Sequence, residues 1–356
     1  MARPVPPPSP RPDGLRTFTD DELFAATNGF AAGRVLGEGG FGRVFRGALL
    51  SGAAVADVAV KLLDREGMQS EAEWRAEVGA LIRVRHANVV HLVGVCEDGG
   101  RRRVRGTVLA AIDGPNLRAA LDGRGGALPW PARLAAVAGA AAGLAAAHAA
   151  GVAHGDFASS NIIVAARAGG VLCDFGLARP AGATEPRVGQ PGYAPPEATS
   201  AASPPPGATA AAADVYALGV VLAEVLTGLD AHPARAAAAP ALADLEALAP
   251  LIDATLFTPA GDGPCAASVA AAAEVAAACL DADPAARPPA ARAAEYLGKA
   301  AAAARRGSGA PLRRPQPHRP PARPVPHLLD SGAAPPPATP RTAARLAFGG
   351  SGNPFL

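Results

Sequence analysis

Cysteine and lysine are scarce in this chain of 356 residues. It has four cysteines, none paired with another by a short spacing, which excludes a disulfide framework and the spacing of a structural zinc site, and which is typical of a reduced intracellular protein. Only two of the 33 basic residues are lysines, Lys61 and Lys299. The formal net charge is only +2, so no charge excess indicates a nucleic-acid partner.

Signals for the membrane are also missing. The N-terminus lacks the apolar segment of a signal peptide, and Ala2 stands where N-myristoylation requires glycine. The longest apolar stretch, residues 131–152, contains Arg133 and His148. We expect it to be a buried helix rather than a membrane span.

Proline, glycine and arginine dominate both ends of the sequence without apolar periodicity. Such segments bury too little apolar surface to fold. We therefore predict a disordered arm over residues 1–17, a folded body over residues 18–303, and a disordered tail over residues 304–356.

The folded body changes character along its length. Its first part alternates β-forming runs with turns, and Trp74, Val78 and Leu81 recur at the spacing of one amphipathic helix. From Leu117 onward the pattern is mostly helical and alanine-rich. These patterns predict an α+β protein in which a β-rich lobe with one helix precedes a mostly α-helical lobe.

A glycine cluster lies between two predicted strands and fits the pattern G-x-G-x-x-G-x-V. Its members are Gly37, Gly39, Gly42 and Val44. Glycines there let the backbone close over a polyphosphate with no Cβ in the way, and the valine can cover a purine ring.

Lys61 follows in the strand-like run VAVK. Its ammonium is a compact charge that can reach the α and β phosphates of a nucleotide, and in an arginine-biased chain its presence is informative. Glu77, sixteen residues downstream on the predicted helix, can hold it by an ion pair.

Three further residues complete the chemistry of phosphoryl transfer. Asp174 begins the triplet DFG after an apolar strand, and its carboxylate suits Mg²⁺. Asp156 in VAHGDFASSNIIV can accept the proton of a hydroxyl, and Asn161 offers an amide oxygen to a second Mg²⁺. Together these motifs resemble the eukaryotic protein kinases over residues 18–303.

The resemblance implies the bilobal kinase fold, with an N-lobe over residues 31–112 and a C-lobe over residues 113–303, and implies ATP, Mg²⁺ and a protein as ligands. It also assigns further positions. The residues implied beside the adenine are Val44, Ala59, Leu109 as gatekeeper, Ala111 and Ile163. The residues implied in the regulatory spine are Leu81, Leu92, His154 and Phe175, anchored by Asp214. Glu197 and Arg287 match a buried ion pair of the family.

The stretch FTDDELFAATNGF, residues 18–30, resembles the segment that precedes the kinase domain in plant receptor-like kinases. The cytoplasmic type is the better match. This implies cytoplasmic localisation, with plasma-membrane association only through partners, and an upstream receptor kinase.

Three positions depart from the family pattern. Gly155 replaces the arginine that receives an activation-loop phosphate, Ala158 replaces the lysine beside the γ-phosphate, and Gln190 replaces the threonine that bridges this lysine to the catalytic aspartate. The first hypothesis is therefore a Ser/Thr protein kinase, slow and not gated by activation-loop phosphorylation. The alternative is an ATP-binding pseudokinase scaffold, and Gln190 leaves tyrosine specificity open.

Overall fold

A computed structural model gives the structure of the protein. It describes residues 15–39, 42–51, 54–63, 71–97, 104–123, 126–166, 169–185, 189–199, 203–259, 262–307 and 309–313. These residues belong to one compact unit that extends to Pro315. The arm before residue 15, the tail after residue 313, and Gly40 and Phe41 of the glycine cluster lie outside the described residues.

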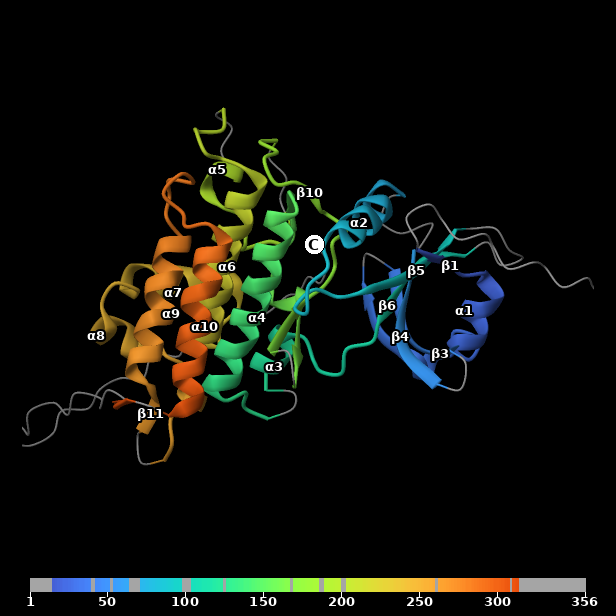
Figure 1. Ribbon diagram of the computed structural model, residues 1–356. Coiled ribbons are helices and arrows are strands. Elements are labelled where there is room, and N and C mark those ends of the chain that lie inside the picture. The colour runs from blue at the N-terminus through green and yellow to red at the C-terminus, as the bar shows by residue number, and fades with distance from the viewer. Residues whose placement is uncertain are drawn as a thin grey trace, which may run out of the picture. The chain divides into compact units, whose positions relative to one another are not determined.

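A six-stranded sheet forms the β-rich lobe, in the order β1-β5-β6-β4-β3-β2 (Figure 1). Neighbouring strands are antiparallel except β1, which runs parallel to β5. On β4, Val58 and Val60 are buried in an apolar cluster, whereas Ala59 and Lys61 face the other side, as the two-residue period of a strand requires. The strands are β1 (Arg16–Thr17), β2 (Val35–Gly39), β3 (Gly42–Ser51), β4 (Ala54–Leu62), β5 (Leu92–Glu97) and β6 (Arg105–Ala110).

Two helices pack on this sheet. Helix α1 (Asp20–Ala26) begins at a capping box in which Thr19 and Glu22 bond to each other's backbone N–H, and it packs on β3. Helix α2 (Glu71–Arg83) packs on β5 through the predicted apolar stripe, of which Trp74, Val78 and Leu81 are buried. The stripe carries Glu77 inward with it, because that residue lies on the same face.

The second lobe is mostly helical. Helix α4 packs on α10 and on the short strand β9, and α6 packs on α9 and α7 (Figure 1). The helices are α3 (Leu117–Leu121), α4 (Trp130–Ala149), α5 (Pro196–Thr199), α6 (Ala210–Thr227), α7 (Ala231–Ala238), α8 (Leu245–Leu248), α9 (Ala266–Cys279) and α10 (Ala290–Arg306). The strands are β7 (Val152–Ala153), β8 (Ile162–Ala165), β9 (Gly169–Leu172), β10 (Arg179–Pro180), β11 (Asp262–Cys265) and β12 (Pro311–Arg313).

By length and composition, α4 and α6 could each cross a membrane. Yet 50% of the most apolar window of α4 and 83% of that of α6 are buried inside the protein. Arg133 of α4 is itself only 1% exposed and forms an ion pair with Asp253 at 2.6 Å. Both helices therefore form the core of the helical lobe.

The α+β organisation predicted from the sequence is confirmed, but both limits of the folded body were wrong. Arg16 and Thr17 pair with β5, and Leu15 is buried against the cluster that contains Trp74. Helix α10 continues to Arg306, and β12 pairs with β11 and buries Leu312. These segments are ordered by contacts with residues far away in the sequence, which local composition does not report.

Candidate active site

A cavity of about 430 Å³ lies between the glycine hairpin, strands β4 and β6, and the segments around Asn161 and Asp174. This volume is in the range of small-molecule sites. The predicted residues in its wall are Gly37, Gly42, Val44, Ala59, Lys61, Glu77, Leu109, Asn161, Ile163 and Asp174. Further wall residues that the sequence did not indicate include Leu36, Val90, Ile112, Asn116, Ser160 and Cys173.

The β2–β3 hairpin forms the roof of this cavity. Gly39 pairs with Gly42, whose φ of +103° belongs to the region that favours glycine. At Gly37, a Cβ would find no heavy atom within 4 Å, so the backbone here faces open space. The hairpin therefore leaves room for a ligand to lie close to the main chain.

Ala111 is a correction to the predicted adenine wall. The cavity is lined on either side of it by Ala110 and Ile112, and not by Ala111. The Ala111 N–H continues the strand pairing instead, donating to the Asp57 carbonyl at 3.2 Å. Successive residues of an extended chain face opposite sides, so Ala111, just after the end of β6, faces away from the cavity.

Lys61 lies at the centre of the charged part of the site. Its Nζ is 3.2 Å from both carboxylate oxygens of Glu77 and 2.9 Å from Asp174 Oδ1. Burial disfavours the charged ammonium, but the two carboxylates outweigh burial and raise the pKa of Lys61 above its usual value. The cation is therefore permanently charged and held between the two lobes.

Asp174 has a left-handed backbone, with φ of +63°. A non-glycine residue in this region stores about 1 to 3 kcal/mol, and such strain is characteristic of functional sites. The ring of the next residue, Phe175, packs at 4.6 Å from the His154 ring, and both residues are fully buried. Asp214 accepts the backbone N–H of His154 at 2.7 Å and so fixes the loop that follows.

Asp156 and Asn161 face each other across that loop. Asn161 Nδ2 donates to the backbone oxygen of Asp156 at 2.8 Å and to its Oδ2 at 2.9 Å. Because the amide nitrogen is used in this way, the amide oxygen of Asn161 is turned away from Asp156. Asn161 thus lies in the cavity wall, and Asp156, which is not itself a wall residue, is held directly beside it.

The departures Ala158 and Gln190 are both close to Asp156: Ala158 follows it by two residues in the chain, and Gln190 bonds to it. Ala158 is fully buried, and Gln190 donates to Asp156 through its backbone N–H at 2.9 Å and its side-chain Nε2 at 3.1 Å. Sequence reasoning described Gln190 only as the loss of a threonine. The signal in the sequence was that Gln190 occupies the family position whose threonine reaches the catalytic aspartate.

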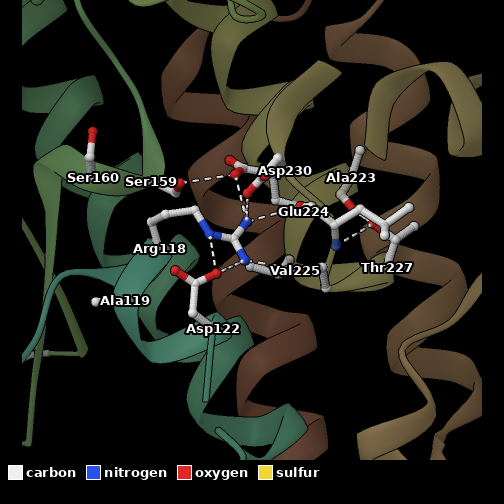
Figure 2. Close-up of polar contacts among 12 residues, drawn as sticks. Arg118, Ala119, Asp122, Ser159, Ser160, Ala223, Glu224, Val225, Thr227 and Asp230 are labelled. Carbon is white, nitrogen blue, oxygen red and sulfur yellow. Dashed lines mark hydrogen bonds and ion pairs between the residues drawn. The ribbon is translucent and has the colours of Figure 1, made fainter. Parts of the chain in front are cut away.

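A buried polar cluster beneath the loop centres on Glu224 of α6 (Figure 2). This carboxylate is fully buried and accepts from Arg118 Nη1 and Ser159 Oγ at 3.0 Å, and from the Tyr193 hydroxyl at 2.8 Å. Burial raises the pKa of Glu224, although its hydrogen bonds and Arg118 oppose this rise. The cluster links α3, the loop that carries Asp156 and Asn161, and the segment after Gln190 to the buried helix α6.

The segment that carries Gln190 has a second anchor. Arg287 forms two bonds to Glu197, from Nη1 at 2.6 Å and from Nη2 at 2.8 Å. Both side chains are buried, and Arg287 also donates to the Ala212 and Asp281 carbonyls. The ion pair implied by the family resemblance is therefore present.

The residues at the cavity fit a nucleotide with a divalent cation. Asp174 engages Lys61 through Oδ1, which leaves its second oxygen for a cation, and Asn161 offers its amide oxygen nearby. Hard oxygen donors of this kind suit Mg²⁺. The wall formed by Val44, Ala59 and Ile163 is apolar, as a flat purine ring requires.

Comparison with known proteins gives the same assignment. Residues 30–297 match the family model described as protein tyrosine and serine/threonine kinase. Among relatives from Arabidopsis thaliana, the chain is 39% identical to the receptor-like serine/threonine-protein kinase ALE2 over 60% of this chain and 28% of the relative. It is 37% identical to the probable serine/threonine-protein kinase PBL28 over 62% of this chain and 60% of the relative.

These matches cover only part of each relative, between about a quarter and three fifths of its length. The family model, in contrast, covers most of this chain, and the matched residues include the cavity, Lys61, Asp156 and Asp174. The chain therefore belongs to the protein kinase family, and its relatives include receptor-like kinases of plants.

Proposed function

We propose that the protein is a Ser/Thr protein kinase that uses MgATP. The observation that carries this proposal is the ion cluster of Lys61, Glu77 and Asp174 in the wall of the cavity. In kinases this lysine–glutamate pair and the DFG aspartate must both be in place for transfer.

Each residue has a proposed role. Lys61 binds the α and β phosphates, and Glu77 keeps its ammonium in position. Asp156 orients the hydroxyl of the protein substrate and accepts its proton as the oxygen attacks the γ-phosphorus and ADP leaves. Asn161 and Asp174 would hold Mg²⁺, which when bound neutralises phosphate charge.

The purine pocket is proposed to consist of Val44, Ala59, Leu109 and Ile163, with the chain around Ala110 and Ile112 along its edge. Gly37, Gly39 and Gly42 would cover the phosphates. A protein substrate would present its hydroxyl near Asp156, and a receptor kinase upstream is consistent with the names of the relatives. We propose action in the cytoplasm, with membrane association through partners.

Two features favour a kinase without phosphate gating. Gly155 offers no cation for an activation-loop phosphate, and among residues 177–185 and 189–197 of the described segment the only Ser or Thr is Thr184. Its hydroxyl is exposed.

Ala158 favours a second candidate, an ATP-binding scaffold without transfer. Removal of one preorganised charge typically costs about 10²- to 10³-fold in rate. Kinases turn over about 1 to 100 times per second, so this loss predicts a slow enzyme rather than an inactive one. The intact Asp156, Asn161 and Asp174 favour catalysis.

Phosphate incorporation into a generic protein substrate tests the proposal, with radiolabelled ATP and Mg²⁺ and with Asp156→Ala as the control. We expect incorporation by the parent protein and background levels for the variant. Equal incorporation by both would contradict the assignment of Asp156. Failure of both to transfer, while MgATP raises the melting temperature, would establish the scaffold instead.

A further inference from the structure

We propose that Gln190 is a positioning residue for the base, and that its side-chain amide replaces the lysine and threonine pair that this chain lacks. The inference rests on the proposed kinase function. Gln190 touches both oxygens of Asp156, through its backbone N–H to Oδ1 at 2.9 Å and through Nε2 to Oδ2 at 3.1 Å. Asn161 Nδ2 adds a third donor at 2.9 Å.

The orientation of the Gln190 amide is fixed by Ser160. The Ser160 hydroxyl donates to Gln190 Oε1 at 2.9 Å, so the oxygen end of the amide is used there and the nitrogen end points to Asp156. A glutamate at this position would put a second carboxylate against Asp156. Glutamine thus satisfies two requirements at once, because its amide oxygen accepts from Ser160 while its amide nitrogen donates to Asp156.

The backbone that carries Gln190 comes unusually close to the base. A Cβ on the preceding residue, Gly189, would lie 2.5 Å from Asp156 Oδ1, so a larger residue would displace the segment. On the other side, the Ser159 hydroxyl lies 3.0 Å from the Tyr193 hydroxyl, and both contact the buried Glu224; Figure 2 shows the contact between Ser159 and Glu224. The Tyr193 N–H in turn donates to the Gln190 carbonyl at 3.4 Å, so the anchored Tyr193 helps to keep the Gln190 backbone beside the base.

Two carboxylate oxygens have about four acceptor positions. Three are filled by Gln190 N, Gln190 Nε2 and Asn161 Nδ2, which leaves one for the substrate hydroxyl. The neutral amide orients Asp156 but brings no positive charge to the γ-phosphate. Gln190 accordingly keeps Asp156 in position. The positive charge that the family's lysine brings to the γ-phosphate is absent, because Ala158 stands at that position.

The test compares steady-state kcat and KM for ATP in the full-length parent and five variants. They are Gln190→Ala, Gln190→Thr, Ala158→Lys, the double variant Ala158→Lys/Gln190→Thr, and Ser160→Ala. Thr199→Ala is the matched surface control, because its side chain is exposed and, within the described part of the chain, bonds to the Pro196 carbonyl of its own helix turn. Melting temperatures with and without MgATP report folding and nucleotide binding for each.

We expect Gln190→Ala to lower kcat by about 10- to 100-fold, since a misplacement of about 1 Å costs this much, while KM for ATP changes less than about threefold. Ser160→Ala should lower kcat by a smaller factor, because the amide loses its orienting donor. Gln190→Thr should be as slow as Gln190→Ala. The double variant should regain parental activity or exceed it, because the lysine and threonine then support each other.

Unchanged or increased kcat in Gln190→Ala would overturn the inference, because the amide would then be neutral or obstructive. A double variant no better than the two single variants combined would also contradict it. If Gln190→Ala does not fold, Gln190→Thr and Ser160→Ala decide the question. Absence of transfer by the parent above the Asp156→Ala background refutes the proposed function itself, and this inference with it.

Discussion

Removal of the ion pair between Arg287 and Glu197 is expected to destabilise the protein strongly, because both side chains are at most 9% exposed. Arg287→Met keeps the length of the side chain but removes the two bonds to Glu197 and the bonds to the Ala212 and Asp281 carbonyls. Glu197 would then be a buried carboxylate without its cation. Loss of one partner of such a pair costs about 3 to 5 kcal/mol.

A domain of this size loses about 2 to 4 °C of melting temperature for each kcal/mol. The expected fall is therefore about 6 to 20 °C, measured by circular dichroism during heating. The rate of phosphate transfer should fall too, because the contact of Arg287 with Glu197 anchors the segment in which Gln190 bonds to Asp156.

The double variant Arg287→Met/Glu197→Gln provides the control. With both charges removed, it should be more stable than Arg287→Met alone, and the difference measures the penalty of the unpaired carboxylate. A melting temperature of Arg287→Met within about 1 °C of the parent would refute the reasoning. The reasoning would also be refuted if the destabilisation of the double variant equalled the sum of the destabilisations of the two single variants.

Three further predictions follow from individual residues. Gly94→Ala should lower the free energy of unfolding by about 1 to 3 kcal/mol, because its Cβ would clash with the Arg16 carbonyl and lie 2.5 Å from the Phe18 ring; urea denaturation measures this, and an unchanged midpoint contradicts the docking of β1. Desolvation raises the pKa of the half-buried Cys173 thiol to about 12, which disfavours the reactive thiolate although the residue lines the cavity; maleimide labelling followed by mass spectrometry should therefore be slower for Cys173 in the folded protein than in the urea-unfolded protein, and equal rates would contradict this. Thr184→Ala should leave the rate of phosphate transfer within about twofold of the parent, because the Thr184 side chain is exposed; a large drop in this rate would show that the hydroxyl gates the enzyme.

Much of the site could be predicted because the chemistry restricts the residue types. A lysine in an arginine-biased chain, sixteen residues before a glutamate on the inner face of a helix, indicated an ion pair, and the two side chains do meet. The family resemblance also indicated the contact between Arg287 and Glu197. The first pair depends on charge and helical period, which the sequence records, whereas the second was implied by the resemblance alone.

Other features depend on contacts that the sequence does not record. Leu15 and Leu312 are buried by distant elements, so composition placed both outside the folded body. The direction of the Ala111 N–H follows from the pairing of β6 with β4. Gln190 was interpreted as a loss, because its contact with Asp156 depends on a segment folded back over the loop.

Transfer of labelled phosphate by the purified parent, compared with Asp156→Ala under the same conditions, tests the central claim most directly. The account predicts transfer that depends on added Mg²⁺, that is slow against the usual kinase range of about 1 to 100 per second, and that Asp156→Ala abolishes. The opposite result is no transfer by the parent although MgATP raises its melting temperature. That result would show that the cavity with Lys61, Glu77 and Asp174 binds a nucleotide without catalysing transfer.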